Sequence, residues 1–561
     1  MTENPPENKL PQDNSDQYNS PGPYAATTDL NDLKDQPVKK EKLGREPLSK
    51  GGIIAWLVIA VVVTGMVTLT AVARHSEETN TEATASDLFP VQQQARVHVG
   101  QKYFFGIQSS KSKDGDSDID RDIDRDDEDQ NQTDSDDENQ DADEDQKEKT
   151  WSSGPAVPEA LNDGTYEQRL CYVLLIREND GPDEAATKLT ELDEAATEAD
   201  FELNEDQSKL RTIVGTLIKS HQDGDPDAEG TSDDDRDYLK TKLGWIGELA
   251  LVPEGTRNVE TRKELQADAS RSMGVMMGFF GLVLLSMMGG VVLAAIFSVL
   301  FATKRLEPKF MTRGKSTNIY IETFALWIVF FFVGPQLTAL AVSFAGIELG
   351  MTADMLISIG FFFGSLVVLV YPVMRGIPFK QVCDDIGWKA KGGLIDILVS
   401  PVNYIAGIPL MMIGLVCVGI LTVLASMLTA AKPFGTGVAA SHPIQDIIAS
   451  GEWWSILYIV VMACIAAPIV EETMFRGVLY RHLRELSSNW ALWGSVIFSA
   501  VFNGLIFAAI HPQGFVAIPL LTCLAINFSL VREWRDSLIA PMIMHGINNG
   551  AVTALMLLMM M

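Results

Sequence analysis

Long apolar stretches recur along the chain, and each is close to the length of a membrane-spanning helix. A helix needs about 20 predominantly apolar residues to cross a bilayer. One stretch lies near the N-terminus, and eight follow one another in the second half. They cover 53–73, 273–303, 323–344, 355–374, 397–428, 453–480, 493–510, 515–531 and 538–559. The pattern predicts an all-α, polytopic transmembrane bundle with one anchor helix and an eight-helix core, in which the short stretch 515–531 could instead be re-entrant.

The polar part of the chain divides into three regions. Residues 1–50 are rich in Pro, Asn, Asp and Lys and are predicted to be a disordered tail, followed by the anchor at 51–74. Fifty polar residues ahead of the anchor argue against its alternative, a cleaved signal peptide. Residues 75–154 are predicted to be an acidic, low-complexity linker, and residues 155–272 a small helical domain. Within that domain the apolar residues of 210–218 recur with helical spacing and predict one face of an amphipathic helix. Residues 273–561 form the membrane domain.

The distribution of basic residues predicts the orientation in the membrane, because Lys and Arg concentrate in cytoplasmic loops. They fall on alternate connections between the apolar stretches. The cytoplasmic set is Lys39, Lys40, Lys42, Arg45, Lys50, Lys304, Arg305, Lys309, Arg313, Lys315, Arg375, Lys380, Lys389, Lys391, Arg481, Arg484, Arg532 and Arg535. The N-terminus is therefore predicted to be cytoplasmic, and the acidic region and the C-terminus extracytoplasmic.

Charge and hydrophobicity occupy different parts of the chain. Its 561 residues carry a formal net charge of −30 and are 47% hydrophobic, with most of the acid before Ser272. Residues 111–150 alone hold 19 acidic and 6 basic residues, as expected of a solvated linker. No basic run with interleaved aromatics is present, which argues against nucleic acid as a partner. The five cysteines do not indicate a disulfide framework.

Two adjacent glutamates interrupt one of the apolar stretches. Glu471 and Glu472 lie in "ACIAAPIVEETMFRGVLY", and ionisable groups inside a membrane are costly and usually functional. Glu472 and Arg476 are four residues apart, which places them on one helix face as a pair. Glu471 is rotated by about 100° from Glu472 and has no local partner, so it is free to act. Pro468 is expected to open or kink the helix.

Polar residues also occur in two later apolar stretches. His511 follows Phe507 by four residues, and His545 precedes Asn549 by four. A carboxylate beside a histidine can activate water as a general base, while a second histidine and an amide stabilise an oxyanion. Glu471, His511 and His545 could alternatively hold one divalent metal such as zinc. No HExxH or GxSxG motif is present.

Other polar residues have simpler interpretations. A lone histidine or asparagine in a membrane helix is often a hydrogen-bond partner between helices. His442 and His482 are interpreted as surface groups. Glu322 and Asp396 lie at the ends of apolar stretches, from which their side chains can reach the interface.

At these residues the sequence resembles the CAAX protease and bacteriocin-processing (CPBP) family, the type II CAAX prenyl endopeptidase or Abi family of intramembrane proteases. The first family motif, two glutamates followed after three residues by arginine, matches "EETMFR". The second matches Phe507 to His511 in "FAAIH", and the third His545 to Asn549 in "HGINN". The three motifs occur in order on separate apolar stretches within residues 468–550.

The resemblance implies that Glu471 and His511 activate the attacking water and that His545 and Asn549 stabilise the oxyanion. It gives Glu472, Arg476 and Phe507 structural roles. Family members are described both as metalloproteases and as metal-free glutamate proteases, so the cofactor is either absent or one divalent metal. The family core has eight spans, which makes the anchor and the acidic domain an added module.

The sequence therefore predicts an intramembrane endopeptidase in a bacterial cell membrane. Its substrate would be a peptide or a membrane protein, with a lipidated one among the alternatives, and no feature indicates an oligomeric state. Two other functions are open. Buried Glu and His residues also build proton relays in membrane carriers, and the acidic domain is compatible with a non-catalytic scaffold.

Overall fold

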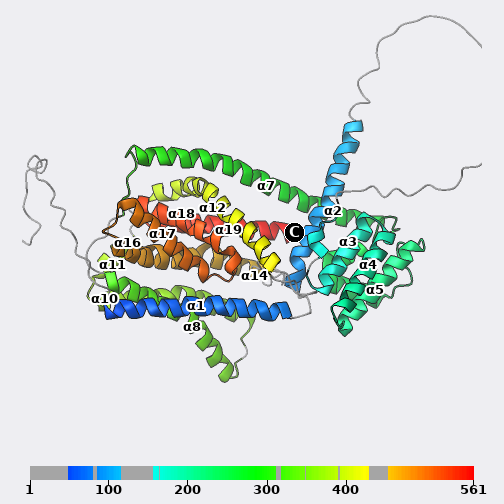
Figure 1. The fold of residues 1–561 in the computed structure, drawn as a ribbon, viewed down its shortest axis with the longest axis horizontal. Helices are drawn as coiled ribbons and strands as arrows, with labels where there is room; N and C mark the ends of the chain where they lie inside the picture. Colours follow the sequence, from blue (N-terminus) through cyan, green and yellow to red (C-terminus); the bar gives the residue numbers. More distant parts are fainter. Residues whose placement is uncertain are drawn as a thin grey trace, which may run out of the picture. The chain divides into compact units, whose positions relative to one another are not determined.

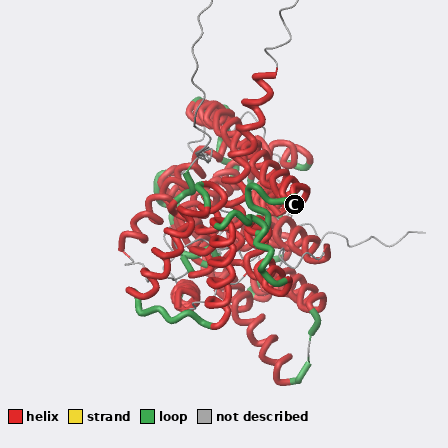
Figure 2. The backbone as a smooth tube through the Cα atoms, turned by 90° about the vertical axis from the view of Figure 1, so that its right-hand side faces the viewer, coloured by secondary structure: helices red, strands yellow, loops and turns green. Residues whose placement is uncertain are grey.

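The computed structural model describes residues 49–79, 85–114, 156–162, 164–310, 317–347, 349–388, 392–428 and 453–560. These residues form helices and connecting turns, and no strand occurs among them (Figure 2). The predicted disordered tail, most of the acidic linker, and His442 lie outside the described residues. The all-α fold class predicted from the sequence is confirmed.

The helices fall in two parts of the chain, one before α7 and one from α7 onward. The first is α1 (Lys50–Thr79), α2 (Ala85–Asp114), η1 (Glu159–Asn162), α3 (Tyr166–Asn179), α4 (Pro182–Glu198), α5 (Glu205–Gln222) and α6 (Asp233–Ala250). The second begins with α7 (Val259–Ala302), α8 (Thr317–Phe344), α9 (Met351–Gly364), η2 (Ser365–Leu369), α10 (Val370–Met374), α11 (Phe379–Ile386) and α12 (Leu394–Leu428). It ends with α14 (Trp453–Val461), η3 (Met462–Ala466), α15 (Ala467–Glu472), η4 (Thr473–Leu479), α16 (Tyr480–Leu486), α17 (Leu492–Ala509), η5 (Phe515–Ala517), α18 (Ile518–Arg535) and α19 (Ile539–Met560).

Eight helical segments within the described residues are long and apolar enough to cross a membrane. They correspond to the first eight predicted stretches, including the short one, which is a 21-residue segment at Phe515–Arg535. The ninth predicted span is present as the 22-residue helix α19 but is not among the eight. It carries the polar residues His545, Asn548 and Asn549 in an otherwise apolar helix.

The N-terminal helix α1 is part of the membrane bundle. It packs along α8 (Figure 1), and Ala55 and Ile59 are buried in the same apolar cluster as Trp327. Trp56 Nε1 donates a hydrogen bond to His482 Nε2 at 3.3 Å. The interpretation of His482 as a surface group is wrong, because its side chain is fully buried. The anchor is therefore an integral packing element of the bundle.

A helix also occupies part of the segment predicted to be linker. Helix α2 buries Leu88, Val91, Ala95 and Val99, which recur every three or four residues. The prediction of linker for residues 75–154 is therefore wrong over Ala85–Asp114, where apolar side chains recur with helical spacing between the more polar residues. Helix α2 packs against α7.

The helices α3 to α6 form a compact polar-surfaced domain with α2 and the first turns of α7. Its core includes Leu170, Leu210, Val214, Leu217 and Leu239, all nearly inaccessible. The predicted amphipathic face of 210–218 thus lies inward. The capping boxes at Thr165 and Asn204 start α3 and α5 by satisfying free backbone N–H groups.

A buried polar cluster ties this domain to α7. Arg262 at the start of α7 forms an ion pair with Glu178 at 2.6 Å and donates to Tyr103 Oη at 2.9 Å. Burial, with the neighbouring Glu178 charge, raises the pKa of Tyr103 to about 12, so the phenol stays a neutral donor near neutral pH. Since α7 is a single helix of 44 residues in all, the polar domain and the membrane bundle share one continuous helix.

Helix α7 meets α12 at a close backbone approach. Gly290 is buried, and a Cβ at this position would clash with the backbone carbonyl of Ile405. At the preceding Gly289 the nearest atom to an added Cβ would lie 3.9 Å away. Glycine lets the two helix backbones approach closely in the membrane, as small residues commonly do.

Gly290→Ala is therefore expected to destabilise the protein by about 1 to 3 kcal/mol, because backbone atoms must move to admit the methyl group. Gly289→Ala is the matched control, with an ordinary van der Waals contact and no expected loss. Thermal unfolding of both variants in detergent tests this difference. Equal midpoints for the two variants would contradict the close α7–α12 contact.

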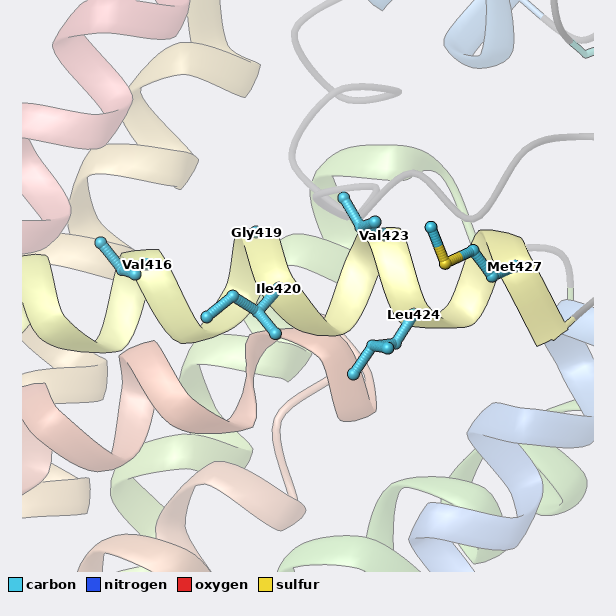
Figure 3. Close-up of a pocket in the computed structure, with 6 residues that line it drawn as sticks. All are labelled: Val416, Gly419, Ile420, Val423, Leu424 and Met427. Carbon is cyan, nitrogen blue, oxygen red and sulfur yellow. The ribbon is translucent and has the colours of Figure 1, made fainter.

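The C-terminal half of α12, from Val416 to Met427, presents exposed apolar side chains. Figure 3 shows Val416, Ile420, Val423, Leu424 and Met427 along the helix, where they line a shallow groove. Each of these side chains is about half exposed or more in the isolated protein. A face of this kind is expected where a membrane helix contacts lipid tails.

Buried ion pairs gather near the basic ends of the spans. Asp396 bonds to Arg535 at 2.6 Å, and Glu533 bonds to Arg484 at 2.9 Å. Asp396 is fully buried, so its predicted position at the interface is wrong. Removing Arg535 would leave the Asp396 charge buried and uncompensated, which is strongly destabilising.

Candidate active site

The helix that carries the two glutamates is widened on both sides of them. The stretches Met462–Ala466 and Thr473–Leu479 are π-helical, with the short α15 between them. Pro468 lies in the first turn of α15 and has no N–H to donate, which disrupts the regular bonding of the preceding turn. Widened turns of this type are frequent at functional sites.

Asparagines from two other helices bond to carbonyls of the widened stretches. Asn549 Nδ2 on α19 donates to Ala463 O at 2.8 Å, and Asn503 Nδ2 on α17 donates to Phe475 O at 2.8 Å. Backbone groups freed inside a membrane require such partners. These bonds hold the glutamate-bearing segment to its neighbours.

Glu472 and Arg476 form the pair predicted from their spacing. Arg476 Nη1 donates to Glu472 Oε1 at 2.9 Å, and both side chains are fully buried. The guanidinium lies over the rings of Phe507 and Phe528, at 4.6 and 5.2 Å from their centroids. Ring faces attract cations, so the two rings stabilise the Arg476 guanidinium, whose Nε and Nη2 atoms have no hydrogen-bond partner among the described groups.

Glu471 points toward two histidines, His511 in the turn after α17 and His545 on α19. Its Oε2 lies 3.8 Å from His511 Nε2 and 3.9 Å from His545 Nε2. No described group forms a hydrogen bond with Oε2, although the atom is buried. Both distances are too long for direct hydrogen bonds but suit a small polar molecule between the groups.

The opposite nitrogen of each histidine is already held. His511 Nδ1 lies 2.6 Å from Phe507 O, and His545 Nδ1 lies 2.9 Å from Glu472 Oε1. A carbonyl and an arginine-paired carboxylate can only accept, so both Nδ1 atoms must carry hydrogen. In the neutral rings, the Nε2 lone pairs therefore face Glu471.

Aromatic rings fix the planes of the two imidazoles. Phe507 lies 4.2 Å from the His511 ring, and Phe528 stacks on His545 at 5.4 Å between centroids. Phe507 also contacts Phe475 edge to face at 5.1 Å. The residue four before His511 therefore acts both through its carbonyl and through its ring.

Comparison with known proteins adds direct support for the predicted family. The family model for Rce1-like type II CAAX prenyl endopeptidases matches residues 453–551. Residues 453–551 are thus similar to an Rce1-like domain. The match includes every candidate site residue and confirms the resemblance seen in the three motifs.

Two curated proteins resemble the same part of the chain. The membrane-embedded CAAX protease MroQ of Staphylococcus aureus is 33% identical over 94 residues, which cover 17% of this chain and 37% of MroQ. An uncharacterized 24.3 kDa protein of Escherichia coli is 27% identical over 134 residues, which cover 24% of this chain and 55% of the relative. The chain thus spans about a third to a half of these curated relatives. No solved structure matches it.

The donor groups of the Rce1-like domain bear on whether it holds a metal. Two imidazoles with held Nδ1 atoms and a carboxylate are donors that zinc accepts. Nevertheless, no three His, Cys, Asp or Glu side chains in the described ranges are arranged to hold a metal ion. The Glu471 oxygen and the two Nε2 atoms are more widely spaced than the roughly 3.3 Å expected between ligands of one tetrahedral zinc with bonds of about 2.0–2.1 Å. The geometry therefore does not fit this metal.

Several contacts of the site could not be identified by the motifs. Glu472 holds His545 as well as Arg476, and Phe528 stacks on His545. Tyr404 Oη on α12 donates to Asn548 Oδ1 at 3.1 Å, and Asn548 Nδ2 donates to Asn549 Oδ1 at 3.1 Å. The motif spacing carried no signal for Phe528 or Tyr404, because both act through contacts between helices.

Proposed function

We propose that the chain is an intramembrane endopeptidase that hydrolyses a peptide bond at Glu471, in the manner of CAAX-processing enzymes. The observation that carries the proposal is the convergence of the Glu471 carboxylate with the Nε2 atoms of His511, in the turn after α17, and His545, on α19. The Rce1-like domain supports a peptidase. A buried carboxylate with unsatisfied oxygen is suited to take a proton from water.

In the proposed reaction, a water molecule lies between Glu471 and His511 and attacks the carbonyl carbon of the scissile bond. Its proton passes to Glu471 as the new C–O bond forms and the carbonyl oxygen becomes an oxyanion. The proton then moves to the leaving nitrogen as the C–N bond breaks. This sequence leaves a carboxylic acid and an amine and regenerates the Glu471 carboxylate.

His545 and Asn549 are proposed to stabilise the oxyanion. Glu472 holds His545 at Nδ1, so a protonated ring can donate from Nε2 toward the reacting centre. The Asn549 amide uses one hydrogen on Ala463 O and retains a second. Removing one oxyanion donor of this kind typically costs a factor of about 10² to 10³ in rate.

The substrate is proposed to be a peptide or a membrane protein that reaches the site from the lipid bilayer. MroQ is named as a CAAX protease, so we include a lipidated C-terminal peptide among the proposed substrate classes. The membrane is proposed to be a bacterial cell membrane, with the N-terminus in the cytoplasm and the C-terminus outside. The alternation of Lys and Arg between connections supports this orientation.

Cleavage of a peptide library by the purified full-length protein in detergent tests this function. We expect cleavage that persists in a strong zinc chelator, because the described side chains do not form a ready metal site. A zinc-dependent protease treated in parallel verifies that the chelator works. Cleavage that disappears with chelator and returns with zinc would contradict the metal-free reaction but keep the peptidase. Glu471-dependent transport into vesicles with no cleavage would instead support a carrier.

A further inference from the structure

A second cavity lies on the far side of α12 and α18 from the catalytic groups. It has a volume of about 520 Å³ and is bounded by α7, α12, α18 and the start of α17. Its walls include the rings of Phe297, Phe301, Trp493 and Trp534. The volume falls in the range of ordinary small-molecule sites, and the aromatic walls suit an apolar ligand.

Two buried amides line this cavity with unused hydrogen-bond donors. Asn403 on α12 and Asn527 on α18 are only 3% and 7% exposed. The Nδ2 atom of each has no partner among the described groups. A Cβ at Gly407 would clash with the Asn527 amide, so this side chain is closely confined. Unpaired buried donors cost about 1 to 3 kcal/mol each, which a ligand with acceptor oxygens would recover.

The mouth of the cavity is basic. Ala302 and Pro308 line the cavity, and the turn between and beside them carries Lys304, Arg305 and Lys309 with one acid, Glu307. Glu533 also lines the cavity, and its charge is paired with Arg484 at 2.9 Å. All three cations are exposed. None of them is ion-paired with an acidic side chain that the structure describes. This arrangement favours an anionic group at the mouth.

Two tryptophans that line the cavity indicate where its mouth lies relative to the membrane surface. Trp493 lies in the first turn of α17 and Trp534 in the last turn of α18, next to the basic turn that follows α7. Tryptophan is enriched where a membrane meets water, at the level of lipid headgroups. An occupant that enters here would place its polar part at the interface and its apolar part between the helices.

The cavity is separated from the catalytic site by the helices themselves. Asn527 lines the cavity, whereas the next residue, Phe528, stacks on His545. Asn403 lines the cavity, whereas the next residue, Tyr404, bonds to Asn548. Consecutive helical residues point about 100° apart, so the occupant does not approach the catalytic groups. This placement argues against the peptide substrate as the occupant.

We propose that this cavity binds one glycerophospholipid with an anionic headgroup. An acyl chain lies between the aromatic walls, and ester oxygens accept hydrogen bonds from Asn403 and Asn527. The phosphate lies beside the three cations of the turn, Lys304, Arg305 and Lys309. The lipid thereby joins α7 to α12 and α18, and neighbouring residues on α12 and α18 contact Asn548 and His545.

Lipid retained by the purified full-length protein is the first measurement, made by native mass spectrometry and phosphate analysis. Ala294→Phe fills the cavity, because Ala294 lines it. Ala295→Phe is the matched control, since Ala295 is exposed on the same helix and does not line the cavity. We expect retained lipid to fall about tenfold in the first variant only, a loss of about 1.4 kcal/mol in binding. Equal lipid in both variants would overturn the proposal.

Headgroup selectivity is the second measurement, and it requires no substitution inside the cavity. Delipidated protein is titrated with phosphatidylglycerol or phosphatidylcholine in detergent. We expect a preference for phosphatidylglycerol that Arg305→Gln with Lys309→Gln reduces about tenfold, because each surface cation contributes about 1 kcal/mol to binding an anionic lipid. The absence of any preference in the wild type would overturn the anionic site. If a prenylated peptide displaced the bound phospholipid and excess phospholipid did not, the cavity would be a substrate-binding site instead.

Discussion

Glu471→Gln is expected to lower the rate of peptide cleavage by about three orders of magnitude while leaving the protein folded. The amide cannot take a proton from water, and general-base catalysis contributes a factor of about 10² to 10⁴. Folding should survive because Glu471 Oε2 has no hydrogen-bond partner among the described groups. Removal of a buried charge without a close partner does not break a structural bond.

The measurement compares initial cleavage rates and thermal unfolding for the wild type and the variant. Asp354→Asn is the control, since Asp354 is an exposed carboxylate at the start of α9, outside the candidate site. Unchanged cleavage by a well-folded Glu471→Gln protein would exclude Glu471 as the base. A fall in rate together with a large fall in unfolding temperature would show a structural role instead.

Substitution of His511 provides a second test of the proposal that Glu471 and His511 act on one water molecule. His511→Gln and Glu471→Gln should each remove most of the activity, and the double variant should lose little more than either one. Residues that act on one proton transfer are strongly non-additive. Multiplied losses in the double variant would indicate that the two side chains act independently. The 3.8 Å between His511 Nε2 and Glu471 Oε2 predicts the non-additive result.

The sequence was sufficient for those features that depend on local pattern. Apolar length identified the membrane helices, and the spacing of Glu472 and Arg476 identified their ion pair. Periodicity also identified the inward face of 210–218. Each of these follows from residues close together in the chain, where helix geometry alone fixes the neighbours.

Features that depend on distant partners were predicted poorly. His482 follows a basic flank and has a surface-like local sequence, but its partner Trp56 is 426 residues away. Asp396 is buried only because Arg535 reaches it from another helix. Sequence spacing likewise placed Asn549 beside His545, but it could not show that the amide holds Ala463 O. Burial and pairing of polar groups are properties of helix packing, which one sequence does not specify locally.

Helix α19 shows how a membrane helix accommodates polar side chains. A span is recognised by uninterrupted apolar residues, yet this helix carries His545, Asn548 and Asn549. Their cost in the membrane is offset by hydrogen bonds to Glu472, Tyr404 and the Ala463 carbonyl. These polar residues therefore attach α19 to α12 and to the helix segment that carries the two glutamates.

Arg476→Gln is expected to destabilise the fold by about 3 to 5 kcal/mol, which separates the role of Glu472 from that of Glu471. The substitution leaves the fully buried Glu472 carboxylate without its cation, and an uncompensated buried charge has this cost. It also removes the cation from between the rings of Phe507 and Phe528.

The double variant Glu472→Gln with Arg476→Gln distinguishes a lost charge pair from lost packing. Replacing both members of a buried pair is far less costly than replacing one, so the double variant should regain part of the stability lost in Arg476→Gln. Reversible unfolding in detergent measures both, with Glu471→Gln as the reference that retains wild-type stability. Cleavage should nevertheless stay low in the double variant, because a neutral amide at position 472 no longer provides the carboxylate that holds His545 Nδ1. Wild-type stability in Arg476→Gln would contradict the ion pair as the support of the site, and full activity in the double variant would contradict the role of Glu472 in orienting His545.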